Sequence, residues 1–281
     1  MTDQQLKVGV WFYGLGTVLT GILDIAWRAF DPSHQPVQSL GGHLPGQPIL
    51  ACAAGAWLIA AGLAVLWRRS ARIGAVASGL AYLVFAALWL PRYAAGIHAY
   101  GWRAAVLLGV SFGLAQQIML LAPAAIIYTS AALPGSLSQK RAATAARWML
   151  GLPPVLFGLF HLVGLRVFAG IVPPWMSFGY FWAGFTGIAF LLAGCAICSG
   201  VMDVPAARLL GLMLLLFEGF VEVPPIFIRL HNLPTWGAAV YNVTAIGACW
   251  IFAAFLLSGA DRERIGHAES VALPRQDRVV A

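Results

Sequence analysis

The stretch VGVWFYGLGTVLTGILDIAWR, from Val8 to Arg28, decides the fold class. It stays almost entirely apolar for about twenty residues, and Asp24 is its one acidic residue. A helix rises about 1.5 Å per residue, so about 20 residues cross the roughly 30 Å hydrocarbon core of a bilayer. Strands of membrane barrels need only about 10 residues. This stretch therefore predicts a transmembrane helix.

Seven further apolar runs follow along the chain, with prolines, glycines and charges between them. We expect the eight helices at residues 8–28, 48–67, 71–90, 104–128, 148–170, 178–200, 206–229 and 237–258. The composition agrees, because the chain is 60% hydrophobic and only 10% charged, whereas soluble domains are roughly 25% charged. We therefore expect an all-α, polytopic membrane protein, and a soluble globular class is excluded.

The positive charges are divided unequally between the loops. Twelve of the 17 Lys and Arg residues fall on the side that carries both termini. The five on the other side are Arg28, Arg92, Arg103, Arg166 and Arg229. The positive-inside rule then predicts a multi-pass protein of the cell (inner) membrane with both termini in the cytoplasm. Since topology accounts for the net charge of +7, nucleic acid is not expected as a partner.

Two parts of the chain share a pattern of glycines. The stretch GLGTVLTGILDIAW (14–27) aligns with GLPPVLFGLFHLVG (151–164) at an offset of 137, and the glycines of the next span align at an offset of 132. The matched glycines are Gly14, Gly21, Gly55 and Gly62 in the first half and Gly151, Gly158, Gly187 and Gly194 in the second. These matches predict two repeats of four helices. Because four is an even number, the repeats should be parallel.

These landmarks divide the chain into four segments. We expect the first repeat at 1–129, a cytoplasmic linker at 130–147, the second repeat at 148–258 and a cytoplasmic tail at 259–281. The tail is polar and has no sustained hydrophobic period. Such a composition favours disorder, because too little apolar surface can be buried.

The pattern resembles the DoxX-like family of four-helix membrane proteins, present here twice. The first helix of each half carries Gly-x-x-Asp (Gly21–Asp24) or Gly-x-x-His (Gly158–His161). The second helix is rich in Gly and Ala, and the third opens with Ala-Arg in both halves. The resemblance covers most of residues 10–255 and implies the four-helix fold. The family is named after a subunit linked to thiosulfate:quinone oxidoreduction, so the resemblance also implies quinone as a candidate substrate.

The second half contains most of the ionisable residues expected inside the membrane. Such residues cost roughly 2.5–3.5 kcal/mol at a helix centre on insertion scales, so each one indicates a structural or functional role. Glu218 and Glu222 lie one turn apart in the seventh span, and His161 lies in the outer half of the fifth. We predict that these three line one polar cavity, open to the outside, as a binding or proton site. The residues expected to join them are Arg166, Arg229, His231 and Asn242. The alternative is a network that only fixes helix packing.

A second candidate pair lies in the first half. Asp24 and Arg28 are four residues apart near the outer end of the first span, so in a helix they would share one face. This spacing predicts an interfacial ion pair that anchors the helix end. The corresponding third helix of this half, from Tyr82 to Trp89, is apolar apart from one hydroxyl. We therefore expect the functional site in the second half and a mainly structural first half.

The sequence contains no clear pattern of residues for binding a metal or a cofactor. No metal-ligand spacing is recognised, and His161 is the one histidine clearly inside a span, which argues against a membrane haem. Cys195 and Cys198 form a C-x-x-C motif without a cationic neighbour in sequence to activate a thiol. We expect no metal and no resident cofactor, with quinone considered only as a substrate.

Three functions remain open. The first is a quinone- or lipid-linked oxidoreductase subunit, the second a transporter or permease-like protein, and the third a non-catalytic membrane assembly partner. Residues 209–217, on the inner side of Glu218, read LLGLMLLLF without one polar side chain, which disfavours transport through the second half. The expected partners are membrane lipids, a lipid-soluble small molecule and a partner subunit in the membrane.

Overall fold

The computed structural model describes residues 2–32, 45–130 and 136–272. Every regular element in these ranges is a helix, and eight stretches are long and apolar enough to cross a membrane. The elements are α1 (Thr2–Trp27), α2 (Gln47–Leu66), α3 (Ala71–Tyr100), α4 (Ala104–Ser130), α5 (Leu137–Val163), α6 (Leu165–Ala169), α7 (Gly179–Ser199), α8 (Asp203–Phe217), η2 (Glu218–Glu222), α9 (Val223–Ile228) and α10 (Leu233–Ala272). The predicted all-α, polytopic fold is confirmed.

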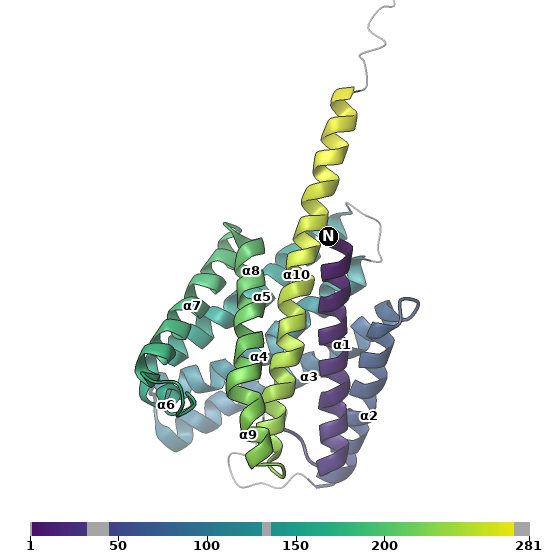
Figure 1. The fold of residues 1–281 in the computed structure, drawn as a ribbon. Helices are drawn as coiled ribbons and strands as arrows, with labels where there is room; N and C mark the ends of the chain where they lie inside the picture. Colours follow the sequence, from purple (N-terminus) through teal and green to yellow (C-terminus); the bar gives the residue numbers. More distant parts are fainter. Residues whose placement is uncertain (1, 33–44, 131–135, 273–281) are drawn as a thin grey trace, which may run out of the picture.

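The last helix of each half packs against the first helix of the other half. α10 packs along α1, and α4 packs along α5, while α1 also packs on α2 and α5 on α7. The two halves therefore interlock. α10 also contacts α4 and α8, and its membrane-spanning part is 72% buried, more than any other span. Figure 1 shows α10 beside α1, with the N-terminus and the projecting part of α10 at the same end of the bundle. We call this end the termini end.

Glycines bring the helix backbones together in the same way in both halves. A Cβ atom built on Gly62 would lie 2.6 Å from the carbonyl oxygen of Gly14, and one built on Gly194 would lie 2.6 Å from that of Gly151. The second pair of matched glycines gives the same result, since Gly21 meets Gly55 and Gly158 meets Gly187. Any larger residue would push α1 from α2, or α5 from α7. These are the glycines that the sequence alignment paired.

The seventh span is not a single regular helix. α8 ends at Phe217, a π-helical turn (η2) follows, and α9 completes the span. The backbone N–H of Val223 bonds to the carbonyl oxygen of Glu218, five residues back. Pro224 and Pro225 have no N–H, so two regular helical hydrogen bonds cannot form there, and a wider turn results. Glu218 and Glu222 thus lie at the two ends of the π-turn.

Two of the predicted boundaries need correction. α5 begins at Leu137, where Ser136 caps it by accepting a hydrogen bond from the N–H of Gln139 at 3.3 Å, so most of the expected linker 130–147 is helical. α10 continues to Ala272, so 259–272 of the expected disordered tail is also helical. A helix already formed in the membrane extends without a new nucleation cost, and no proline interrupts it before Pro274. Residues 273–281 lie outside the described residues.

Candidate functional site

His161 lies on α5 in an aromatic enclosure. Its side chain is 8% exposed, and Nδ1 lies 2.8 Å from the carbonyl oxygen of Phe157 one turn earlier. Its ring stacks on Phe168 with 3.7 Å between centroids and tilts against Phe190 at 5.3 Å. Within the described residues, no hydrogen bond or ion pair joins His161 to Glu218 or Glu222. The histidine is thus enclosed by aromatic rings and by its own helix.

The other candidates of the second half are scattered. Glu218 and Glu222 are half-buried on η2 and close enough to interact electrostatically, and Oε2 of Glu218 is buried without a hydrogen-bond partner. Asn242 is 7% exposed on α10. The exposed residues of the set are Arg166, Arg229 and His231. No hydrogen bond or ion pair among the described residues draws this set into the single cluster that we expected.

The expected ion pair of the first half does not form. Asp24 is fully buried on α1, and neither of its carboxyl oxygens has a hydrogen-bond partner among the described residues. Arg28 is exposed and has a φ of 50°, because α1 has already ended at Trp27. The i,i+4 geometry of a helix therefore does not extend to Arg28. The prediction of an anchoring pair was wrong, and Asp24 points into the protein.

Asp24 ends a buried polar stripe along α1. The stripe consists of Tyr13, Thr17, Thr20 and Asp24, all at most 7% exposed. Their spacing of four, three and four residues keeps them on one helix face, over about 16 Å at roughly 1.5 Å per residue. The sequence analysis missed this stripe because it weighed ionisable residues and passed over hydroxyls. The spacing itself was readable in the sequence.

The stripe is hydrogen-bonded to α3 and α4. The hydroxyl of Tyr13 lies 3.1 Å from Ser78 Oγ and 3.2 Å from the carbonyl oxygen of Leu120. Thr17 donates to the carbonyl oxygen of Tyr13 at 2.8 Å, and its Oγ1 lies 3.0 Å from the Tyr82 hydroxyl. The network satisfies the polar groups of Tyr13 and Thr17 and reaches Tyr82. Nearer the end of the stripe, Thr20 donates to the carbonyl oxygen of Gly16 within α1 at 3.0 Å, and the carboxyl of Asp24 has no hydrogen-bond partner among the described residues.

A small cavity lies beside Asp24. Its volume is about 10 Å³, which is room for one water-sized occupant. The polar residues that line it are Thr20, Asp24, Asp31, Tyr82, Tyr241 and Thr244. α1, α3 and α10 thus meet at this point. We call it the Asp24 cavity.

Two glycines let α10 close the Asp24 cavity. A Cβ atom on Gly16 of α1 would collide with Oγ1 of Thr244, and one on Gly237 of α10 would collide with Oδ2 of Asp31. Both side chains therefore lie directly against the backbone of the opposing segment. The cavity exists only because the last helix of the second half packs on the first half, which no spacing within one helix could have predicted.

Asp31 has a cationic neighbour, in contrast to Asp24. The guanidinium of Arg92 interacts electrostatically with Asp31 and donates through Nη1 and Nη2 to the carbonyl oxygen of Pro32, at 3.2 Å each. It also lies over the ring of Trp89, 3.8 Å from the centroid. Arg92 thus offsets the charge of Asp31. Among the described residues, no cationic side chain is found beside Asp24.

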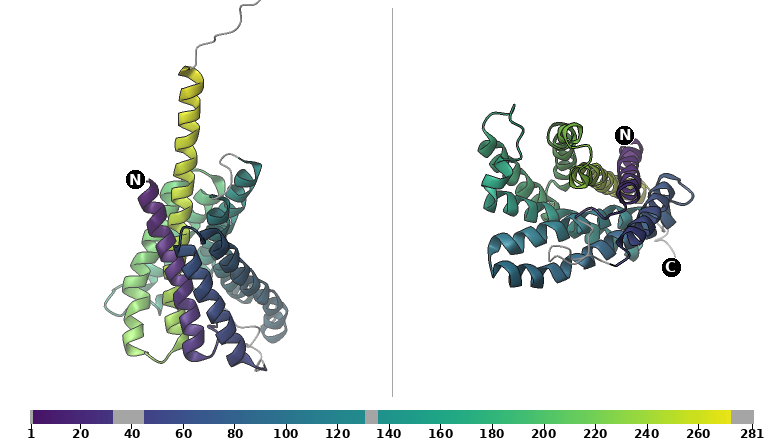
Figure 2. Two further views of the ribbon diagram at one scale, coloured as in Figure 1. Left: turned by 90° about the vertical axis from the view of Figure 1, so that its right-hand side faces the viewer. Right: turned by 90° about the horizontal axis from the view of Figure 1, so that it is seen from below.

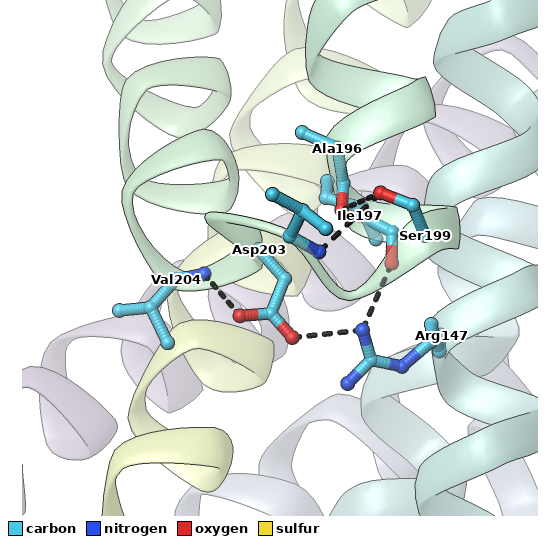
Figure 3. A network of polar contacts seen from close by, with 7 residues as sticks. Arg147, Ala196, Ile197, Ser199, Asp203 and Val204 are labelled. Carbon is cyan, nitrogen blue, oxygen red and sulfur yellow. Dashed lines mark hydrogen bonds and ion pairs between the residues drawn. The ribbon is translucent and has the colours of Figure 1, made fainter.

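A further polar network, at the termini end, has a structural role. Nη1 of Arg147 on α5 contacts Oδ2 of Asp203 at 2.8 Å and donates to the carbonyl oxygen of Ile197 at 3.0 Å (Figure 3). Asp203, the first residue of α8, also accepts a hydrogen bond from the N–H of Val204 at 2.8 Å and so satisfies one backbone donor in the first turn. This network ties α5, the end of α7 and the start of α8 together.

The chemistry of the candidate site rests on Asp24 and its neighbours. Within the residues that the structure describes, no group of three or more His, Cys, Asp and Glu side chains is placed to hold a metal ion. Cys195 is exposed and Cys198 half-buried on α7, and both are free thiols.

No family model matches the chain, and neither a curated protein nor a solved structure matches it.

Proposed function

We propose that this protein is a membrane-embedded subunit that exchanges a proton at Asp24 on behalf of a quinone- or lipid-linked oxidation–reduction reaction. The observation that carries the proposal is the fully buried carboxyl of Asp24, which faces a cavity and has no hydrogen-bond partner in the part of the chain that the structure describes. Acidic side chains inside transmembrane bundles characteristically belong to proton relays or ion pathways. The site therefore belongs to the first half together with α10, and the second half supplies mainly framework.

The glycine contacts support an internal duplication and the resemblance to the DoxX-like family. Matched glycines make matched backbone contacts between α1 and α2 and between α5 and α7. In this alignment Asp24 and His161 occupy the same position. A duplicated ancestor would explain why one half keeps an acidic site while the other has an aromatic enclosure in its place.

The position of the stripe favours exchange on one side of the membrane over transport across it. Asp24 lies far from the termini end, and the charge distribution predicts that its end is the outer one. On the termini side of Tyr13, the helix face continues with Val10, Gly9 and Leu6, which are apolar. The polar chain therefore stops half-way, so that a proton could reach Asp24 from outside without crossing to the cytoplasm.

A second candidate function is that of an assembly partner, and one observation favours it. α10 continues as a helix from Ser258, where the span ends, to Ala272. The left view of Figure 2 shows this extension standing clear of the bundle. A helix of about 14 residues rises roughly 21 Å, which is enough to contact a subunit on the membrane surface.

Infrared spectroscopy of the purified protein in lipid nanodiscs tests the proposed function. We expect a carboxylic C=O band that shifts on hydrogen–deuterium exchange and that changes when a short-chain ubiquinone analogue is added. Asp24→Asn should remove this band, and Glu218→Gln should leave it unchanged. If a well-folded Asp24→Asn protein keeps the quinone-sensitive band, the proposed role of Asp24 is refuted.

A further inference from the structure

Asp31 is a second carboxyl in the wall of the Asp24 cavity. It follows the end of α1, is 7% exposed, and lines the cavity together with Asp24. The two carboxyls are close enough to interact electrostatically, and the backbone N–H of Asp31 also lies beside the carboxyl of Asp24 without forming a hydrogen bond. The cavity volume of about 10 Å³ has room for one water. A single water between two carboxyls is enough to carry a proton from one to the other.

Asp31 is held in place by α3 and α10. The guanidinium of Arg92 on α3 interacts electrostatically with Asp31, and it donates through Nη1 and Nη2 to the carbonyl oxygen of Pro32, the next residue, at 3.2 Å each. Oδ2 of Asp31 lies directly against Gly237 of α10, where a Cβ atom would collide with it. Arg92 itself does not line the cavity. The pair of Asp31 and Arg92 therefore leads from the wall of the cavity toward α3.

Arg92 also lines an open groove between α3 and α4. The volume of the groove is about 280 Å³, which is room for several waters. Alanines and glycines on both helices leave this space open. The groove reaches Tyr100, which is 68% exposed at the end of α3, next to the loop between the two helices. The charge distribution predicts that this loop is on the outer side of the membrane. Arg92 therefore lies between the buried carboxyls and a groove that opens to the outside.

The hydroxyl groups in the cavity wall do not lead outward. Thr20 and Thr244 each donate to a carbonyl oxygen one turn earlier in their own helix, at 3.0 and 2.8 Å. Tyr241 donates to Sδ of Met119 at 3.6 Å, inside the bundle. Tyr82 contacts the polar stripe of α1, which runs toward the termini end. These four hydroxyls are thus engaged within the bundle, in contrast to the carboxyl beside Arg92.

We infer that Asp31 is the second proton-carrying group of this site and connects Asp24 to water in the groove between α3 and α4. A proton that leaves Asp24 passes through one water in the cavity to the carboxylate of Asp31, and from there to water in the groove. Asp24 is then a carboxylate, Asp31 has returned to its carboxylate, and the groove water holds the proton. Arg92 is a positioning residue, because it holds Asp31 between the cavity and the groove. The inference rests on the proposed proton exchange at Asp24, but it needs no quinone.

The rate at which the Asp24 carboxyl exchanges its proton for deuterium tests this inference. The full-length protein in lipid nanodiscs is perfused with D₂O, and infrared spectroscopy follows in time the carboxylic C=O band that Asp24→Asn removes. Asp31→Asn keeps the size of the side chain but cannot carry the proton. We expect it to slow the exchange about a hundredfold, the low end of what a positioned proton-transfer group contributes. A purely structural role of Asp31 predicts the reverse, because loosening the cavity would speed the exchange.

Two neighbouring alanines of α3 supply a matched control for the groove. Ala95 lines the groove, whereas Ala94 is exposed and does not line it. Ala95→Phe should fill the groove and slow the exchange of the Asp24 carboxyl, and Ala94→Phe should leave the rate unchanged. Ala99→Phe, at an exposed position in the groove, is the second filling variant if Ala95→Phe does not fold. Exchange that is as fast or faster in folded Asp31→Asn, or equal in the filled and control variants, would overturn the inference.

The two proposals can fail separately. If the quinone-sensitive infrared band depends on Asp24 while Asp31→Asn exchanges as fast as the wild type, the proposed function stands and the inference about Asp31 is wrong. If Asp31→Asn slows the exchange while quinone leaves the infrared spectrum unchanged, the proton route is supported and the oxidation–reduction role is refuted. If Asp24→Asn removes no carboxylic band, both are overturned, because Asp24 then holds no proton.

Discussion

Asp24 and His161 occupy matching positions in the two halves but have opposite surroundings. Asp24 faces a cavity lined with hydroxyls and has no hydrogen-bond partner within residues 2–32, 45–130 and 136–272. His161 has a hydrogen-bond acceptor in its own helix and is enclosed by Phe168 and Phe190. The glycine framework around both is the same. The framework therefore sets the spacing of the helices, whereas the side chains between them decide whether a site exists.

The residues near Asp24 and those near His161 differ in polarity, although the glycines around them match. At the offset of 137, the hydroxyl residues Tyr13, Thr17 and Thr20 of the first half correspond to Leu150, Pro154 and Phe157 of the second. The stripe that hydrogen-bonds to α3 in the first half thus has an apolar counterpart. Phe157 in turn packs on Phe112 and Phe190, with centroids 4.8 and 5.7 Å away. The second half thus has aromatic packing at the place where the first half has a polar stripe.

Of the predictions made here for paired substitutions, those at Asp24 and His161 should differ most in their effect. Asp24→Asn should abolish the quinone-sensitive infrared band, because it removes a buried carboxyl that has no hydrogen-bond partner among the described residues. His161→Phe should leave this band intact and lower the free energy of unfolding by about 1 kcal/mol, the typical worth of one hydrogen bond. Infrared spectra and thermal unfolding of both variants measure these effects. Loss of the band in folded His161→Phe would contradict the comparison.

The shared glycine framework predicts that matching glycine substitutions lower the free energy of unfolding equally in the two halves. Gly62→Ala and Gly194→Ala each place a Cβ atom 2.6 Å from a backbone carbonyl oxygen, so each should destabilise the protein by about 1–3 kcal/mol, as overpacking does. Gly219→Ala is the control, since nothing lies within 4 Å of its Cβ position. Denaturation in mixed micelles measures the free energy of unfolding of the three variants. A large cost in one half only would show that the glycine contacts are not equivalent.

A smaller effect is expected at the termini end of the second half. Arg147→Met breaks the ion pair with Asp203 and the hydrogen bond to Ile197, and we expect a loss of about 1 kcal/mol, because both side chains of the pair remain partly exposed. Asp203→Asn should cost less, since an asparagine oxygen can still accept the hydrogen bond from the N–H of Val204. The rate of limited proteolysis between α7 and α8 measures how far this connection loosens. Faster cleavage between α2 and α3 in Arg147→Met would argue that this network is not local to the second half.

The smallest effect is expected at the π-turn. Glu218→Gln removes a half-buried carboxyl that has no ion-pair partner among the described residues and that lies near Glu222. The free energy of unfolding should not fall, because glutamine keeps the size of the side chain and removes a charge that burial and Glu222 disfavour. Thermal unfolding measures this. Loss of the quinone-sensitive infrared band in folded Glu218→Gln would return the site to the second half.

The sequence analysis predicted the spans well and the site poorly, for one physical reason. A span is a local property, since length and apolarity along one segment determine it, and all eight spans were found. A site depends on which helices touch. Glu218, Glu222 and His161 are the obvious polar residues of their spans, yet no hydrogen bond or ion pair joins His161 to either carboxyl in the described part of the chain.

Two local features could have been predicted from the sequence, because each depends on one helix only. The π-turn precedes two adjacent prolines, Pro224 and Pro225, and the hydroxyl stripe of α1 repeats at helical spacing. The position of Arg28 could not, since no proline or glycine marks the end of α1 at Trp27.

The sequence alone determined that the chain is helical and crosses a membrane about eight times, because a chain this apolar has to bury its backbone polar groups in helices. It also determined which glycines bring helices together. Only the tertiary structure decided that α10 packs on α1 and so brings Tyr241 and Thr244 to Asp24. The reason is that helix pairing depends on the fit of whole surfaces, which residues more than 200 positions apart make together and which no local pattern records.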